Sequence, residues 1–338
     1  MKRYTRIDVC RLLCAFLVVM IHCVEVFKGH EIAHMIVNCF AQQAVPFFFI
    51  ASGFFFAKKF DASEEKIKVI RSFVLHNLLL YMAWMVVELP ELIRHYHIQY
   101  PDSSVFSHAL HIFRRVVFVG WDVYWYLLVL AEAALVTGLL LYWKKEKWLY
   151  FLAGTGLLVG FAFNANIKMQ PFGLMNDVLF LLFSWNNNIV MEGLPYMAIG
   201  VWFAHHERNI KISERYPIVG YIAVSAASVS LFWINQIYGI NWARFVHLTA
   251  IQATLLFLIA LYPSKYAGAG KWISNCRDLS SCIYFVHNIA IQYIANVFWP
   301  IDSPTLFRFL IGVVPGVLVW LFVRNSKCKP VKWMLSIK

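Results

Sequence analysis

Apolar runs long enough to cross a bilayer recur along the whole of this 338-residue chain. A transmembrane helix needs about 20 mostly apolar residues, and in hydrocarbon a helix satisfies its own backbone hydrogen bonds. The composition agrees, because 61% of the residues are hydrophobic and 14% are charged, against roughly half and a quarter in soluble domains. The sequence therefore predicts an all-α, polytopic transmembrane helical bundle, with a single integral-membrane domain over residues 1–338.

Ten spans are predicted from the positions of these runs. They cover residues 8–27, 34–57, 72–94, 123–143, 148–164, 190–205, 217–235, 244–263, 280–299 and 305–323. Residues 95–122 and 165–188 are predicted to be long outer loops. The first of these loops holds the amphipathic stretch FSHALHIFRRVVF, a pattern that favours the membrane interface.

The distribution of lysine and arginine predicts how the chain is oriented in the membrane. With the N-terminus inside, the inner segments carry 22 of these residues and the outer segments seven, and Arg11 lies within the first span. Positive charge gathers on the cytoplasmic side, so both termini are predicted to be cytoplasmic. The net charge of +12 is thus a topology signal, and no nucleic-acid partner is expected. The seven cysteines are predicted to be free thiols that pack like small apolar residues.

The first span carries four ionisable residues, Asp8, Arg11, His22 and Glu25. At about 100° per residue, all four fall on one stripe of a helix, and Arg11 and His22 differ by only about 20°. Such a stripe must avoid lipid, and Ala15 and Val18 between these residues would leave room along it. The pattern indicates the wall of a passage, with an anion site at one end and an acid–base group at the other. A snorkelling Arg11 and a structural His22 are the competing interpretation.

The spacing Arg11-x10-His22 resembles the signature of the membrane-bound acyltransferase-3 family. The stretches VPFFFIASGFFF (45–56), WYLLVL (125–130), EGLPYMAIG (192–200) and CIYFVHNIAI (282–291) are similar to further motifs of that family, in the same order. One departure is KVIR, with Lys68 and Arg71 where the family often has Arg-x-x-Arg. The first of these stretches also resembles the membrane half of some bacterial amino-acid racemases.

The resemblance implies an enzyme that moves an acyl group, usually acetyl, from a coenzyme A thioester to a hydroxyl of a carbohydrate or lipid-linked glycan. The candidate catalytic residues are His22 as general base, Glu25 to orient it, Glu192 and His287. The candidate acyl-CoA-binding residues are Arg11, Lys68, Arg71, Ser52 and Gly53. Close helix packing is an equal explanation for Ser52 and Gly53, as is topology for the basic residues.

The expected partners are acyl-CoA as the donor substrate, a cell-envelope glycan and the lipid bilayer of a bacterial plasma membrane. No bound cofactor and no metal are expected, since the outer histidines lack metal-type spacing. Aromatic residues such as Trp121 and Trp185 near the outer surface are typical interfacial anchors, and their flat rings could also receive a sugar. Two other functions stay open: a transporter for a small amino-acid-like solute, and an inactive acyl-binding subunit.

Overall fold

The computed structural model describes residues 4–23, 31–102, 104–169, 188–238, 246–263, 270–295 and 305–337. The regular structure of these residues is helical, without strands, and each of the ten predicted spans contains a helix. Five helical segments among them are long and apolar enough to cross a membrane: Glu31–Asp61, Lys66–Gln99, Val105–Tyr142, Arg215–Ile237 and Leu306–Val323. The all-α fold with several membrane-type helices is confirmed. The number of ten spans and the cytoplasmic termini stay predictions.

The chain divides into two compact units. The first comprises Met1–Ser52 and Trp202–Lys338, and the second comprises Gly53–Val201. Helix α3 (Ala44–Asp61) contains the first boundary and helix α9 (Leu194–His206) contains the second. The prediction of a single domain over residues 1–338 is not tested by this division.

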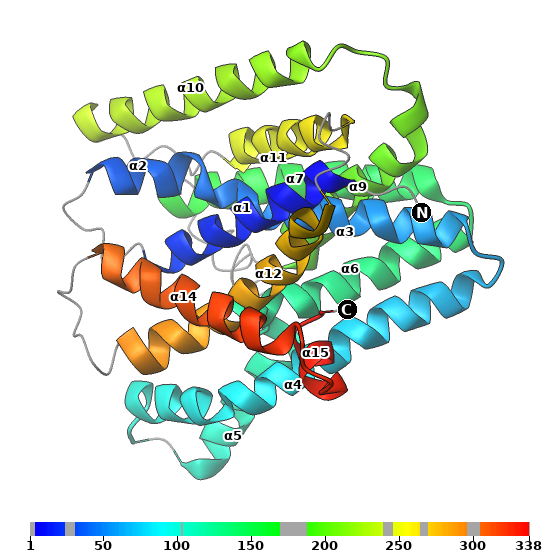
Figure 1. Cartoon of the computed structure of the whole chain (residues 1–338). Helices are drawn as coiled ribbons and strands as arrows, with labels where there is room; N and C mark the ends of the chain where they lie inside the picture. The colour runs from blue at the N-terminus through cyan, green and yellow to red at the C-terminus, as the bar shows by residue number, and fades with distance from the viewer. Residues whose placement is uncertain are drawn as a thin grey trace. The chain divides into compact units, whose positions relative to one another are not determined.

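Helix α1 runs through the first unit. The elements of this unit are α1 (Thr5–His22), α2 (Glu31–Cys39), η2 (Ala41–Gln43), η6 (Glu207–Asn209), α10 (Arg215–Tyr238), α11 (Val246–Leu261), α12 (Gly270–Ile289), η7 (Ala290–Ala295), α14 (Thr305–Val323) and α15 (Lys329–Met334). Helix α1 packs along α12, α12 packs along α14, and α10 packs along α11 (Figure 1). Helix α12 begins ten residues before the span predicted at 280–299, so its first turns carry residues that were expected to lie in an inner loop.

Small residues let these helices approach closely. A Cβ atom at Gly316 of α14 would lie 2.8 Å from the Cα of Ile283 on α12, and one at Gly312 would lie 2.5 Å from the side chain of Val19 on α1. Ala15, Val19 and Ile283 form a fully buried apolar cluster between the helices. All seven cysteines of the chain are free thiols, as predicted.

The start of α1 is tied to the segment that follows α9. The Tyr4 hydroxyl donates to both carboxylate oxygens of Glu207, at 2.8 and 3.0 Å. Burial, and then this bond to an anion, raise the pKa of Tyr4 well above its usual range. Arg6 forms an ion pair with Glu214, and both side chains are half-buried. These contacts hold the end of α1 that carries Asp8 and Arg11.

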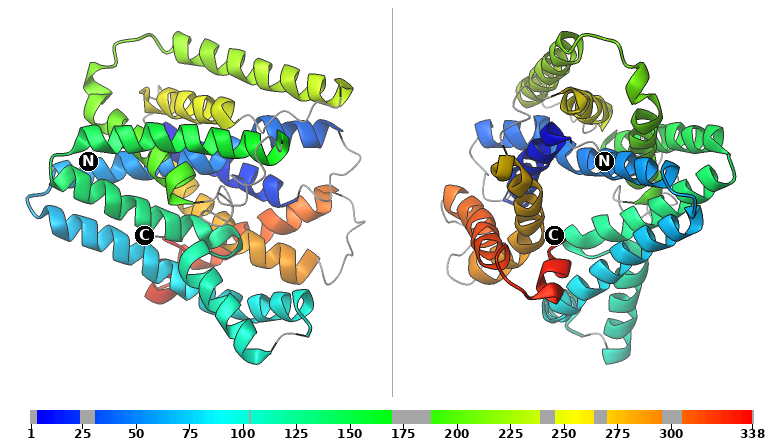
Figure 2. Two further views of the ribbon diagram at one scale, coloured as in Figure 1. Left: turned by 180° about the vertical axis from the view of Figure 1, so that it is seen from behind. Right: turned by 45° about the vertical axis from the view of Figure 1, so that its right-hand side comes forward.

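The second unit is built on the packing of α4 against α6. Its further elements are α4 (Lys66–Gln99), α5 (Val105–Arg114), η3 (Arg115–Val119), η4 (Asp122–Tyr124), α6 (Trp125–Tyr142), α7 (Glu146–Met169) and η5 (Ile189–Gly193). Helices α4 and α6 lie side by side, and α5 packs on α4 near its C-terminal end (Figure 2). The π-helical segment η5 packs on both α6 and α7. Lys66 Nζ donates to the last carbonyls of α3, at Phe60 and Asp61, and so caps that helix.

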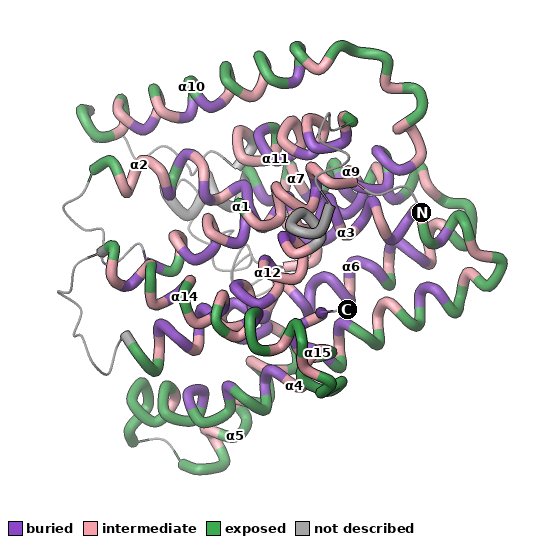
Figure 3. Tube along the Cα trace, in the orientation of Figure 1, coloured by how far each residue is buried: buried purple, intermediate pink, exposed green. Residues whose placement is uncertain are grey.

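Most of the segment 95–122, predicted to be an outer loop, is helical, and its position outside the membrane stays a prediction. Helix α4 continues to Gln99, and α5 and η3 fill 105–119, because the amphipathic stretch forms a helix capped by Ser104. Helix α5 has no buried residue and exposes Phe106 (Figure 3), as an interfacial helix would. In the other predicted loop, 165–188, helix α7 reaches Met169, and residues 170–187 lie outside the described part of the chain.

Gly53 stands where α3 meets α9. A Cβ atom there would lie 2.2 Å from the carbonyl oxygen of Met197. Real Cβ atoms do not approach a backbone oxygen so closely, so only glycine fits without moving one helix. This contact supports the packing explanation of Gly53.

The substitution Gly53→Ala should therefore destabilise the protein, since overpacking typically costs about 1–3 kcal/mol. Gly154→Ala in α7 is the matched control, because a Cβ atom there meets nothing within 4 Å and alanine favours a helix. Thermal unfolding in detergent should show a drop of several degrees for Gly53→Ala and no drop for Gly154→Ala. Equal melting temperatures for the two variants would contradict the close approach of α3 and α9.

Candidate functional site

The ionisable residues of α1 fall into two groups, one near each end of the helix. Asp8 and Arg11 lie within the first two turns, and His22 is the last residue of the helix. The helical rise between Arg11 and His22 is about 16 Å. The structure does not leave open space between these groups, as Ala15 and Val18 are 0% and 3% exposed. The expectation of room along the stripe is therefore wrong: α12 and its neighbours fill it with apolar side chains.

Asp8 and Arg11 form the pair that their spacing predicts. The Arg11 Nη1 atom lies 3.9 Å from an Asp8 carboxylate oxygen, and the two side chains are only 19% and 13% exposed. At this distance the attraction is mainly between charges, because 3.9 Å exceeds the length of a hydrogen bond. A buried charge needs such a partner, so Asp8 offsets the cost of placing Arg11 in an apolar helix.

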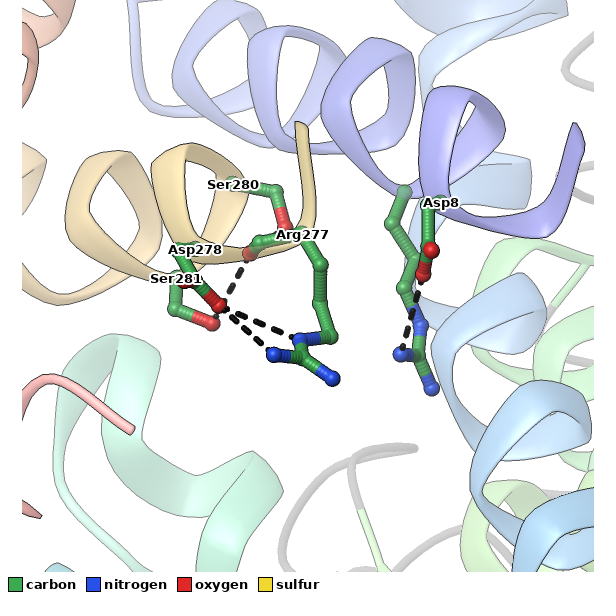
Figure 4. A network of polar contacts seen from close by, with 6 residues as sticks. Asp8, Arg277, Asp278, Ser280 and Ser281 are labelled. Atoms are coloured by element: carbon green, nitrogen blue, oxygen red, sulfur yellow. Dashed lines mark hydrogen bonds and ion pairs between the residues drawn. The ribbon is translucent and has the colours of Figure 1, made fainter. Parts of the chain in front are cut away.

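A second arginine–aspartate pair lies on α12, where sequence reasoning expected a loop. Arg277 donates from Nε and Nη2 to one carboxylate oxygen of Asp278, at 3.1 and 2.9 Å. The hydroxyls of Ser280 and Ser281 donate to the Arg277 carbonyl, at 2.7 and 3.2 Å. Figure 4 shows Arg277 and Asp8 on facing sides of the space between α12 and α1.

Sequence reasoning assigned Arg277 to membrane topology, as one of the positive charges of an inner loop. The missed signal is the run of residues 270–279, which continues the helix of the next span. Once α12 begins at Gly270, Arg277 lies in its second turn, on a helix that packs along α1.

The opposite end of α1 brings two histidines together. The ring centroids of His22 and His287 lie 5.3 Å apart, with the planes inclined by 49°. His287 is fully buried on α12, whereas His22 is exposed. These two residues are called the histidine pair. Sequence reasoning named both but had no means to pair them, since 265 positions separate them in the chain.

The hydrogen bonds of His287 fix the position of its proton. Its Nδ1 atom lies 2.7 Å from the carbonyl oxygen of Tyr284 and 3.1 Å from that of Ile283. A carbonyl oxygen only accepts, so Nδ1 must carry the hydrogen and donate it. In a neutral ring, Nε2 is then the basic nitrogen. The ring of Tyr284, 6.1 Å from that of His287, forms one wall of this end.

Other predicted site residues lie elsewhere in the two units. Ser52 is half-buried on α3, in the first unit. Lys68 and Arg71 are exposed on α4, in the second unit, and Lys68 pairs with Glu65 at 2.8 Å. Glu192 lies in η5, in the same unit. Their convergence with Arg11 and His22 stays a prediction.

The last of the predicted site residues are Glu192 and Glu25. The Oε2 atom of Glu192 is buried, and no described residue donates to it. Asn188 caps η5 by accepting from the backbone of Val190 and Met191, both at 2.9 Å. Glu25 lies outside the described residues. Across the residues that the structure describes, no three metal-ligating side chains gather at one place.

The described residues form helices, and five helical segments are long and apolar enough to cross a membrane, as in an integral membrane protein. Residues 4–324 match the model of the Acyl_transf_3 acyltransferase domain. The match covers nearly the whole chain, so this protein belongs to the acyltransferase-3 family. No curated protein and no solved structure matches it.

The unequal exposure of the two histidines can be tested chemically. Diethyl pyrocarbonate modifies accessible imidazoles, so it should modify His22 and spare His287 in the folded protein. Peptide mass spectrometry of protein treated in detergent would read both sites, and unfolded protein, in which both should react, is the control. Protection of His22 equal to that of His287 would show that His22 does not face water.

Proposed function

We propose that this protein is an integral-membrane O-acyltransferase that moves an acyl group, acetyl in the first instance, from acyl-CoA to a hydroxyl of a cell-envelope or exported carbohydrate. Membership of the acyltransferase-3 family supports acyl transfer in general. The observation that carries the mechanism is the histidine pair at one end of α1, with Arg11 about three turns away on the same helix. The proposed reaction needs an acid–base group for the acceptor hydroxyl and a cation for an anionic group of the donor.

His22 is the proposed general base. It takes the proton of the acceptor hydroxyl as the oxygen attacks the thioester carbonyl, and the imidazolium then returns that proton to the departing coenzyme A thiolate. His287 supports this role from Nε2, since its own proton is held at Nδ1 by two carbonyls. If His287 accepts the N–H of His22, the other His22 nitrogen is left as the base, in the manner of the third member of a triad. Glu25, three residues after His22 in the sequence, is the other candidate for this orienting role.

Arg11 is the proposed contact for an anionic group of the donor. A guanidinium is permanently charged and offers several donors in a plane, which suits a phosphate. A donor whose charged part is remote from its thioester fits a helix with a cation at one end and a base at the other. Lys68 and Arg71 are proposed to attract the phosphates at long range, because both are exposed. Ser52 and Gly53 remain candidates for the thioester arm, and Glu192 for a second acid–base group.

The proposed setting is a bacterial plasma membrane with ten spans and both termini cytoplasmic. Charge supports it, since the inner segments of this topology carry 22 lysines and arginines and the outer ones seven. Acyl-CoA would then arrive from the inside, and a carbohydrate or lipid-linked glycan from the outside.

The topology has a direct test at the turn between α6 and α7. Cysteine at position 145 (Lys145→Cys), in an otherwise cysteine-free protein, should react with a membrane-impermeant maleimide only after the membrane is opened. Ser104→Cys, in the segment assigned to the outside, is the matched control and should react in intact cells. Labelling of position 145 in intact cells would remove the ten-span arrangement.

The chemistry is tested by incubating purified protein with radiolabelled acetyl-CoA and a cell-envelope glycan fraction. His22→Ala should lose about 10²–10⁴-fold in the rate of label transfer, the usual effect of losing a general base, while still binding acetyl-CoA. Arg11→Glu should weaken acetyl-CoA binding more than glycan binding. Glu25→Gln should cost less than His22→Ala.

Three results would contradict the proposal. Turnover near that of the native protein in His22→Ala would move the base to His287 or Glu192. Uptake of a solute into proteoliposomes, without release of coenzyme A, would favour the transporter. Binding of acetyl-CoA without any transfer by the native protein would favour an inactive acyl-binding subunit.

A further inference from the structure

The second unit holds an arginine, Arg115, for which no described carboxylate forms an ion pair. The Nε atom of Arg115 is buried, and no described residue accepts a hydrogen bond from it. Its guanidinium lies over the ring of Trp121, whose centroid is 5.8 Å from Cζ. By contrast, Arg6, Arg11 and Arg277 each have a carboxylate beside them.

Trp121, whose ring lies beside this guanidinium, also has a buried N–H group without an acceptor among the described residues. The side chain is 7% exposed, and its indole Nε1 is buried without an acceptor among the described residues. A buried N–H that donates to nothing costs about 1–3 kcal/mol. Both donors lack an acceptor among the described residues, and one belongs to a charged group that lies over the ring carrying the other. Such donors favour an oxygen-bearing ligand with negative charge.

The backbone holds these two donors in place. Segment η3 is π-helical and ends where the Gly120 N–H donates to the Arg115 carbonyl, at 2.8 Å. The Tyr81 hydroxyl donates to the Val116 carbonyl, at 2.7 Å, and so ties η3 to α4. Gly120 has φ of 82°, and a Cβ atom there would lie 2.6 Å from the Cα of Trp125, so glycine is required. π-Helical turns occur often at functional sites.

Aromatic rings extend away from Trp121 along the end of α4. His95 meets Trp121 edge to face, with centroids 5.1 Å apart. Tyr96 stacks on Tyr100 and on His111 of α5, at 6.0 and 5.8 Å. Tyr100 is 38% exposed, so this strip of rings reaches the surface. Flat apolar faces beside donors for oxygen atoms suit a sugar chain better than a simple inorganic ion.

We propose that Arg115 and Trp121 bind a carboxylate carried on a sugar, and that the ring strip of His95, Tyr96, Tyr100 and His111 receives the sugars next to it. The ligand class is an acidic oligosaccharide. That this ligand is the acyl acceptor rests on the proposed function, whereas the binding site itself does not.

Binding to purified protein in detergent tests the site, with tetragalacturonate as the probe and neutral galactotetraose as its uncharged counterpart. Tetragalacturonate should bind the native protein at least about tenfold more tightly than galactotetraose. Arg115→Gln and Trp121→Phe should each weaken tetragalacturonate binding about tenfold or more, since each removes one donor and keeps most of the shape. Arg114→Gln is the matched control, because Arg114 is the exposed neighbour, and its affinity should stay within about twofold.

Stability separates a ligand site from a structural one. An arginine kept for a ligand is a cost to the empty protein, so Arg115→Gln should leave the melting temperature unchanged or raise it. A fall in the melting temperature, with tetragalacturonate binding retained, would assign Arg115 to the fold and overturn the proposal. Equal affinity for the two tetrasaccharides, or displacement of the probe by phosphatidylglycerol but not phosphatidylcholine, would overturn it as well. Acetyl-CoA binding is the second readout in every variant, so failure of acyl transfer at His22 and failure of this site can be told apart.

Discussion

The packing of α1 along α12 decides where the ionisable groups of the first unit lie. An apolar bundle tolerates a charge only when an opposite charge or a hydrogen bond meets it. Asp8 and Arg11 lie near one end of α1 and His22 lies at the other, and α12, which packs along α1, supplies Arg277, Asp278 and His287. The apolar cluster of Ala15, Val19 and Ile283 lies between these groups and gives the two helices their contact. These ionisable residues are also the residues of α1 whose exposure to lipid would cost the most free energy.

The second unit obeys the same rule in two ion pairs and departs from it at Arg115. Glu91 pairs with Arg94, and Lys68 pairs with Glu65, so charges there also have partners. Among the described residues no carboxylate pairs with Arg115, although Gly120, Tyr81 and Trp121 fix the segment around it. A cation held in this way without an ion-pair partner is what the proposed carboxylate site would require.

The sequence predicts where the helices lie along the chain, but it does not predict which helices pack against each other. Apolar runs locate α1, α4, α6 and α14 because burial in lipid requires length, and length is visible in one dimension. The pair of Asp8 and Arg11 is also predictable, since residues three apart share a helix face. His22 and His287 are named by their motifs, but their pairing depends on the contact between α1 and α12, which no periodicity encodes. Arg277 is missed because charge statistics treat it as a loop residue, although its helix begins at Gly270.

The different kinds of group at the two ends of α1 follow from the cost of burying them. A charged arginine carries its full charge at any depth, so Arg11 near the start of α1 has the carboxylate of Asp8 beside it, and Arg277 of α12 has that of Asp278. A histidine can be buried without charge when its N–H has an acceptor, as His287 has in the carbonyls of Ile283 and Tyr284. The end of the helix that is free of carboxylates among its described contacts can therefore hold imidazoles, which can be neutral or charged. Separation of a permanent charge from a group that can gain and lose one is what the proposed roles of α1, anion binding at Arg11 and proton transfer at His22, would require.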